Sequence, residues 1–354
     1  MNTLSRLVAA SAAVALALGS ARAGQPPVVP SGLVAEPVGE VVDLTPPTLP
    51  GRSAPPAVTQ TLCDEPGAWF ATGEVLLWRP RLGDAAFALL DPRADLTPMG
   101  RVRDVPLDAR AGLRVGAGYR FAGSGWTVGL TYTHFNSTGT QDAVAPPGGV
   151  VYPLLNRPGI VDQAARLTGT ARLNYDLFDL DFSKAVAVDP HLTLRPFAGV
   201  RFADIDTCLG ASADGALARQ AAVHSGSGFQ GAGPTAGAEA AWTVTRRLSL
   251  FGTARGGLLF GTFDGRGRET NANGAVLLAD VADRFSGVAP VVSVGLGGSY
   301  RWRTVSVAAG YEVTHWFGAV SRPSFTDDFA DGRVARRRSD LSLDGVFLRL
   351  GVEY

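Results

Sequence analysis

The sequence lacks most features of a soluble enzyme or a nucleic-acid-binding protein. Only 18 % of its 354 residues are charged, which is little for a surface that faces water on all sides. Its 32 basic and 32 acidic side chains cancel to a net charge of zero, whereas a nucleic-acid partner calls for a clustered basic excess. Two cysteines, Cys63 and Cys208, are too few for a disulfide scaffold, and the strand plan below separates them too far for us to expect a pair.

Long apolar runs are also missing beyond the N-terminus. After residue 23 no stretch approaches the roughly 18 consecutive apolar residues of a membrane-spanning helix, which excludes a helical membrane protein. The first residues do contain an apolar run, at 7–18, between a short polar start and the small residues Ala21 and Ala23. This arrangement predicts a secretory signal peptide over residues 1–23.

Catalytic and metal-binding motifs are scarce. His134 with Ser137 and Asn136 is the one local group that resembles a nucleophile and its base, and sequence proximity alone is a weak signal. We therefore predict that the chain is not an enzyme and that it holds no metal and no cofactor. The histidines stand singly, without the spacing of a metal site: His134, His191, His224 and His315.

Residues 24–66 have a composition of their own. Ten prolines fall in this stretch, with no period of two or of 3.6 residues, which indicates an extended linker rather than a packed domain. We expect a flexible periplasmic arm; the alternative is that the stretch folds back as a plug. Because the prolines leave it little means of packing, we expect the arm to be dispensable for assembly of residues 67–354.

Beyond residue 67 the dominant signal is an alternation of apolar and polar residues with a period of two. In residues 107–121, for example, Leu113 and Val115 share one face with further apolar residues, while Arg114 lies on the other. A strand with two chemically different faces gives this pattern. In the fourth such segment the phase slips near Phe178, which predicts a bulge. Ten strands are predicted, over residues 68–79, 107–121, 126–133, 165–182, 192–202, 235–244, 248–260, 288–302, 305–313 and 346–354.

The connections between these strands alternate in length. Short ones lie near residues 122–125, 184–191, 245–247 and 303. Long ones lie near 82–104, 139–164, 205–228, 263–286 and 317–340. Short periplasmic turns, long extracellular loops and an even number of strands are typical of outer-membrane barrels. The predicted fold is therefore all-β: a transmembrane antiparallel up-and-down β barrel of about 10 strands, located in the outer membrane.

A soluble barrel or sandwich would also alternate. Six aromatic residues weigh against it, because they all fall beside short turns and in the apolar phase. Rings with an apolar body and a polar tip prefer the membrane–water interface. This predicted aromatic girdle comprises Phe121, Trp126, Trp242, Tyr300, Trp302 and Tyr354.

Several strand motifs resemble those of one family. They lie at residues 69–80 (WFATGEVLLWRP), 112–120 (GLRVGAGYR), 126–135 (WTVGLTYTHF), 175–180 (YDLFDL), 194–201 (LRPFAGVR) and 231–234 (GAGP). Over nearly the whole barrel the chain is similar to the Legionella-type pore-forming outer membrane proteins. The resemblance implies a β barrel in the outer membrane that forms a pore.

We assign the polar faces to the lumen, because a charge that faces lipid at mid-membrane depth costs about 2–4 kcal/mol. The inward set then holds ten arginines and six acids, an excess of 10 − 6 = +4. The predicted pore lining is Arg110, Arg114, Arg120, Arg172, Arg195, Arg201, Arg255, Glu239 and Glu312. The rest of the inward set is Arg166, Arg301, Arg349, Glu74, Asp108, Asp176 and Glu353.

Two functions fit this plan. The first is a narrow, weakly anion-selective diffusion pore, which the positive excess and the resemblance favour. The alternative is a closed structural or adhesive anchor that presents long extracellular loops, since barrels of about eight strands are filled by their own side chains. The expected partners are outer-membrane lipids and small ions or solutes, without nucleic acid, and homo-oligomerisation is left open.

Overall fold

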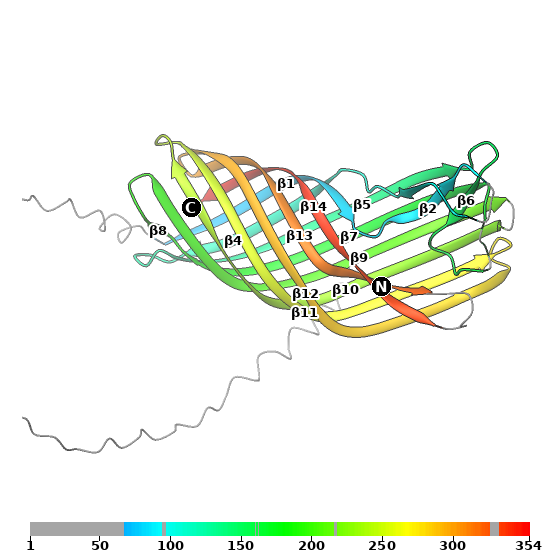
Figure 1. Ribbon diagram of the computed structural model, residues 1–354. Coiled ribbons are helices and arrows are strands. Elements are labelled where there is room, and N and C mark those ends of the chain that lie inside the picture. Colours follow the sequence, from blue (N-terminus) through cyan, green and yellow to red (C-terminus); the bar gives the residue numbers. More distant parts are fainter. Residues whose placement is uncertain (1–66, 94–96, 160, 162, 216–217, 326–332) are drawn as a thin grey trace, which may run out of the picture. The chain divides into compact units, whose positions relative to one another are not determined.

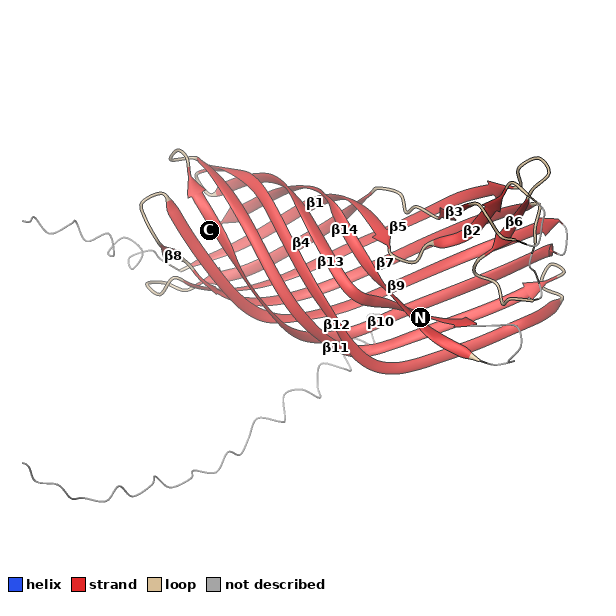
Figure 2. Cartoon of the chain, viewed as in Figure 1, coloured by secondary structure: helices blue, strands red, loops and turns tan. Residues whose placement is uncertain are grey.

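The structure is a computed structural model that describes residues 67–354 apart from 94–96, 160, 162, 216–217 and 326–332 (Figures 1 and 2). The predicted signal peptide, the proline-rich arm and Cys63 lie outside the described residues, so these predictions stay predictions. In the described part of the chain no helix is long and apolar enough to cross a membrane. The strands are β1 (Ala68–Leu82), β2 (Ala86–Asp91), β3 (Arg101–Asp104), β4 (Arg110–Arg120), β5 (Trp126–Val144), β6 (Val150–Pro153), β7 (Arg166–Lys184), β8 (Val186–Ala187), β9 (Leu192–Gly215), β10 (Ala218–Thr243), β11 (Leu248–Asn271), β12 (Val276–Trp302), β13 (Val305–Phe325) and β14 (Val334–Glu353).

Ten of these strands close into one antiparallel ring, which confirms the predicted barrel. The order is β1, β4, β5, β7, β9, β10, β11, β12, β13 and β14. The last strand pairs with the first, from Phe70 opposite Glu353 to Leu82 opposite Leu341, so no free edge remains there. The short β8 pairs with β9 beside the ring, and β2, β3 and β6 form a separate three-stranded sheet. We call the end with the short connections the turn end and the end with β2 and β6 the mouth (Figure 1).

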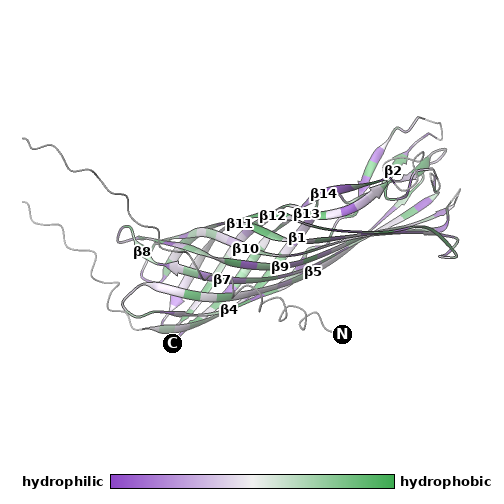
Figure 3. Ribbon diagram, turned by 90° about the horizontal axis from the view of Figure 1, so that it is seen from below, coloured by the Kyte–Doolittle hydropathy of each residue, from purple (hydrophilic) through white to green (hydrophobic). Residues whose placement is uncertain are grey.

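Apolar and polar residues alternate along each strand. As a result, the outer surface of the barrel is apolar over the half nearest the turn end. Outward stretches such as Trp69 to Leu77 in β1 and Val346 to Tyr354 in β14 carry exposed apolar side chains. Each is close to the roughly 9–11 residues that a tilted strand needs to cross a bilayer. Figure 3 shows the apolar and polar positions alternating along the strands. We call this outer zone the apolar belt.

The strands run on past the apolar belt toward the mouth. In β7 the outward residues change from Phe182, Leu180 and Phe178 to Asp176 and Asn174. The predicted loops 205–228 and 263–286 are largely strand here, in the β9–β10 and β11–β12 pairs. Apart from the exposed Val276 and Leu277, their outward positions are mostly polar, charged or small, so they do not show the apolar alternation by which the other strands were predicted. Half of the barrel therefore lies beyond the apolar belt.

The predicted bulge near Phe178 is wrong. β7 pairs without a register shift with β5 on one side and with β9 on the other. The apparent slip arises because the inward residues change from apolar (Tyr175 and Leu177) to charged (Asp179 and Asp181). Over the same stretch the outward residues change from polar to apolar. The interior is thus apolar toward the mouth and charged toward the turn end.

Two insertions fill the mouth from inside. The first contains β2 and β3, and its Phe87 and Val105 lie where a side chain at Gly169 of β7 would be. The second is the mouth end of β13. Pairing between β12 and β13 stops at Val291 opposite Trp316. On its other side β13 stays paired with β14, but the register of that pair shifts between Trp316 and Val320.

A left-handed residue, Gly318 with φ of 57°, marks the point where β13 leaves the wall. Beyond it the Ser321 backbone N–H donates to Ser227 Oγ on β10 at 2.8 Å, and both residues are buried. The mouth end of β13 therefore folds inward, against the inner face of β10, and stays paired with the mouth end of β14. In the described residues, β12 above Val291 has no strand partner on this side.

The apolar belt can be tested with one charge. Leu350 lies outward in the middle of the belt and is 53 % exposed. We expect Leu350→Arg to lower the free energy of unfolding in lipid vesicles by about 2–4 kcal/mol, because the guanidinium must enter hydrocarbon. Asn174→Arg, outward but nearer the mouth, is the matched control and should cost about 0–1 kcal/mol. Equal losses in urea titrations of the two variants would show that the belt is misplaced.

Candidate functional site

Buried ion pairs cross the interior at the depth of the apolar belt. On one side the Glu74 carboxylate, 4 % exposed, accepts hydrogen bonds from Arg114 on β4 and Arg349 on β14. Arg114 also donates to both carboxylate oxygens of Glu312 on β13, at 3.0 and 3.2 Å. Its Nε donates to Thr133 Oγ1 on β5. One guanidinium thus joins four strands of the ring.

A second cluster comes from β7, β9 and β11. Arg201 donates from Nε and Nη2 to the two carboxylate oxygens of Asp179, at 2.7 and 3.0 Å. Arg255 bridges Asp179 and Asp181, with Nη1 at 3.1 Å from an oxygen of each. Each charge in this low-dielectric interior thus has a partner of opposite sign, so removing one partner would leave an uncompensated buried charge. Together the two clusters form what we call the charged layer.

An aromatic layer lies directly on the mouth side of the charged layer. Trp78 on β1 is buried, contacts Phe135 and Tyr175 edge-on or tilted, and donates from Nε1 to Glu312. Trp316 on β13 donates from Nε1 to the Tyr175 hydroxyl at 3.1 Å. The guanidinium of Arg114 lies 5.5 Å from the Trp78 ring. The aromatic layer therefore links opposite walls and fills the interior above the ions.

Several predicted lumen residues do face inward. Arg114, Arg201, Arg255 and Glu312 belong to the charged layer, as described. The remaining inward residues lie nearer the turn end. There Arg120 pairs with Glu353, and Arg195 lies 3.8 Å from Glu239 with both side chains partly exposed.

Other predicted lumen residues lie elsewhere. Arg172 and Arg166 are exposed on the outward face of β7, and Asp176 shares that face. Arg110 is exposed at the mouth end of β4 and contacts Thr138 and Asp108. The assignments of Arg166, Arg172 and Asp176 were wrong because the phase of β7 was read from its apolar residues, which line the interior above the belt and the exterior within it.

The same error hid two acids. Asp179 and Asp181 face inward, which the alternation of Phe178, Leu180 and Phe182 between them could have indicated. The inward set at belt depth now holds seven arginines and six acids, an excess of 7 − 6 = +1 instead of +4. These are Arg114, Arg120, Arg195, Arg201, Arg255, Arg301, Arg349, Glu74, Asp179, Asp181, Glu239, Glu312 and Glu353.

The six predicted girdle residues all lie on the outward face near the turn end. Their exposure ranges from 45 % for Tyr300 to 75 % for Tyr354. Trp126 is in addition covered by the ammonium of Lys184 at 5.5 Å. Rings at this edge of the belt have the position that an interfacial girdle requires.

The weak nucleophile candidate is not assembled. Ser137 faces inward, is buried, and donates from Oγ to the Asp108 carbonyl. His134 faces outward and contacts the Asp176 carboxylate with Nδ1 at 2.8 Å. The two side chains lie on opposite faces of β5, as residues three apart in a strand must. Among the described residues no group of three or more potential ligands could hold a metal ion.

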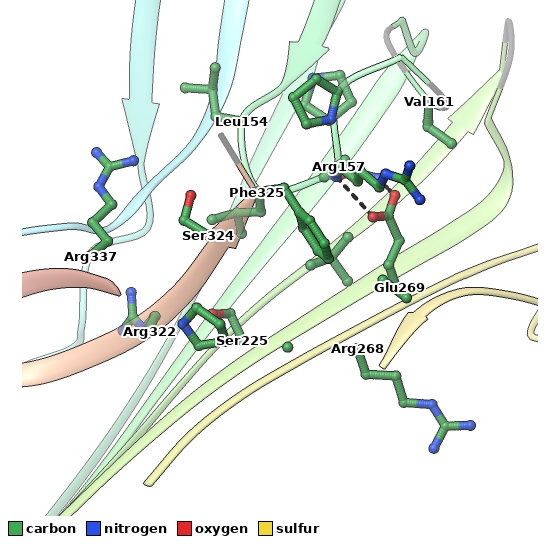
Figure 4. Close-up of a pocket in the computed structure, with 18 of the residues that line it drawn as sticks. Leu154, Arg157, Val161, Ser225, Arg268, Glu269, Arg322, Ser324, Phe325 and Arg337 are labelled. Atoms are coloured by element: carbon green, nitrogen blue, oxygen red, sulfur yellow. Dashed lines mark hydrogen bonds between the residues drawn. The ribbon is translucent and has the colours of Figure 1, made fainter. Parts of the chain in front are cut away.

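The mouth contains a cavity of about 500 Å³ (Figure 4). It lies between the inserted part of β13, the inner faces of β10 and β11, and residues 152–158, which comprise the end of β6 and the segment after it. Glu269 on β11 fixes that segment by accepting from Asn156 Nδ2 and from the Arg157 backbone N–H, each at 2.8 Å. Burial raises the pKa of the Glu269 carboxyl, although these two hydrogen bonds oppose the rise.

Arg322 lines the same cavity and is 4 % exposed. Its Nη1 donates to the Asp84 carbonyl at 2.8 Å, and the Asp84 carboxylate is held by Arg337 at 2.9 Å. Burial lowers the pKa of the Arg322 guanidinium from its usual value, with Asp84 opposing the change. Sequence reasoning missed Arg322 because it lies in a segment predicted as loop.

A closed ring of ten antiparallel strands with an apolar belt defines a transmembrane β-barrel protein. The family model of the Legionella pneumophila major outer membrane protein precursor matches residues 61–354, and the chain belongs to this family. It is accordingly an outer-membrane protein. No curated protein matches the sequence.

Three solved structures illustrate more distant likeness. The outer membrane protease OmpT from Escherichia coli is 12 % identical, with a TM-score of 0.49 over 83 % of this chain and 99 % of that one. Ail, the attachment invasion locus protein of Yersinia pestis, is 11 % identical, with a TM-score of 0.25 over 82 % and 100 %. The Pseudomonas putida toluene transporter TodX is 10 % identical, with a TM-score of 0.29 over 82 % and 90 %. At these values none carries an argument about this chain.

The charged layer makes a prediction about stability. Asp179→Asn keeps the shape of the side chain but leaves Arg201 buried without its counter-charge, so we expect a loss of about 3–5 kcal/mol in the free energy of unfolding. Glu239→Gln removes a partly exposed partner at 3.8 Å and should cost less than about 1 kcal/mol. Urea titrations in lipid vesicles measure the free energy of unfolding of both variants. A loss for Asp179→Asn no larger than that for Glu239→Gln would contradict this role.

Proposed function

We propose that this protein is a closed outer-membrane barrel. Its extracellular half acts as a binding surface, and the apolar belt anchors that surface in the membrane. The observation that carries this proposal is the aromatic layer. Trp78, Tyr175 and Trp316 are each no more than 1 % exposed and join opposite walls through ring contacts and a hydrogen bond. A path for water or ions through that level would require these side chains to move apart.

The filling on both sides of the aromatic layer supports the same proposal. Below it the bidentate Arg201–Asp179 pair and the Arg114 cluster occupy the centre of the charged layer. Above it Phe87 and Val105 from the first insertion are at most 2 % exposed. Side chains thus fill the interior at three successive levels, as expected for a ring little larger than the eight-stranded barrels that side chains fill. The charged layer is the most open of the three, since Arg114 and Arg255 are 18 % and 16 % exposed.

A narrow diffusion pore is the second candidate. The charged, glycine-rich interior near the turn end favours it, since ions enter such a vestibule readily. Conduction would then depend on movement of the aromatic layer and of the inserted part of β13. Any selectivity for anions would be slight, because the inward excess at belt depth is only +1.

Planar-bilayer recording tests the proposal. The parent protein should insert without steady single-channel conductance. Trp78→Ala combined with Trp316→Ala removes two rings from the aromatic layer and should produce measurable channels. Trp126→Ala combined with Trp302→Ala removes the same number of rings from the outward girdle and should leave the barrel closed.

Stable conductance of the parent would overturn the closed-barrel proposal and favour the pore. In that case the reversal potential in a KCl gradient measures its selectivity. Arg195→Glu, at the partly exposed edge of the lumen, is the variant that should shift this potential toward cation selectivity.

A further inference from the structure

The cavity in the mouth contains a buried cation with unused donors. Two nitrogens of Arg322, Nε and Nη2, are buried, and their N–H groups have no hydrogen-bond acceptor among the described residues. The third nitrogen is engaged, since Nη1 donates to the Asp84 carbonyl. A buried guanidinium with unpaired donors is costly, because it loses its hydration without replacement.

The unused edge of Arg322 is the edge that binds carboxylates elsewhere in this molecule. Arg201 presents Nε and Nη2 to the two oxygens of Asp179 at 2.7 and 3.0 Å. Arg336 presents the same two nitrogens to Asp283 at 2.6 and 3.0 Å. The fork geometry of this edge matches a planar carboxylate.

The neighbouring acids do not serve Arg322 in this way. The Asp84 carboxylate is held by Arg337. The Glu269 carboxylate is held by Asn156 and the Arg157 backbone, on the other side of the cavity in Figure 4. The arginines that line the cavity outnumber the acids by 3 − 2 = +1, counting Arg157, Arg322 and Arg337 against Asp84 and Glu269; Arg268 is left out because its side chain lies on the outward face of β11.

The rest of the cavity is apolar. Its walls include Leu154, Leu155, Val161, Val223 and Phe325. A volume of about 500 Å³ is far more than one carboxylate needs and lies in the range of small-molecule sites. The cavity therefore offers one charged anchor and an apolar body, as a site for an amphipathic ligand does.

We propose that the mouth cavity binds a small organic carboxylate, with its two oxygens on Nε and Nη2 of Arg322 and its apolar part among the leucine, valine and phenylalanine side chains. This site goes beyond the proposed function. It stands whether or not the barrel conducts, because the cavity lies on the mouth side of the aromatic layer.

Calorimetric titration of the full-length protein in non-ionic detergent tests the site. The probes are benzoate, its neutral counterpart benzamide, and acetate, which has the charge without the apolar body. We expect benzoate to bind at least tenfold more tightly than either of the others. Arg322→Gln should weaken benzoate at least tenfold, whereas Arg338→Gln, which removes a mouth arginine stacked on Phe263, should leave it unchanged.

The proposal stays testable even if Arg322→Gln does not fold. Arg322→Lys keeps the charge without the fork, so a folded variant with weakened benzoate binding supports the bidentate contact. A second control replaces Asp327, Asp328 and Asp331, which follow β13 in the sequence, by asparagine. Absence of benzoate binding to the parent, or binding only after this triple replacement, would overturn the proposal, because an internal carboxylate would then serve Arg322.

Discussion

The buried pairing of arginine with carboxylate inside the ring is the interaction on which the rest of the structure depends. A ten-stranded ring encloses somewhat more space than the eight-stranded barrels that side chains fill, and its inward positions at belt depth include charged residues. Glu74, Arg114 and Glu312 pair with one another across three strands, as Arg201, Asp179 and Arg255 do across another three. With the charges paired, the interior can exclude water, and the aromatic rings can lie directly on them.

From this arrangement follows an exchange of inside and outside along the barrel axis. At belt depth the outer face is apolar because it meets lipid, and the inner face is charged. Toward the mouth the outer face is polar because it meets water, and the inner face holds Phe135, Tyr175 and Phe229. The inserted β2 and the inward turn of β13 at Gly318 complete that second, soluble-like core.

This exchange explains how much the sequence could predict. The ring of ten strands, the outward girdle and the inward Arg114, Arg201 and Arg255 follow from a period of two within the belt. Where a strand crosses from belt to mouth, its apolar residues change from the outer face to the inner face. For this reason the sequence of β7 predicted a bulge that is not there, and Arg172 was wrongly assigned to the lumen. Pairing partners such as Asp179, and the mouth cavity around Arg322, depend on contacts between distant strands, which no local pattern encodes.

The central claim is that the aromatic and charged layers seal the interior. Solute flux into proteoliposomes tests it most directly, because a small uncharged solute such as urea reports any continuous water path regardless of selectivity. We predict that vesicles containing the correctly inserted protein admit urea no faster than protein-free vesicles of the same lipid. A rate that rises in proportion to the amount of inserted protein would contradict the account.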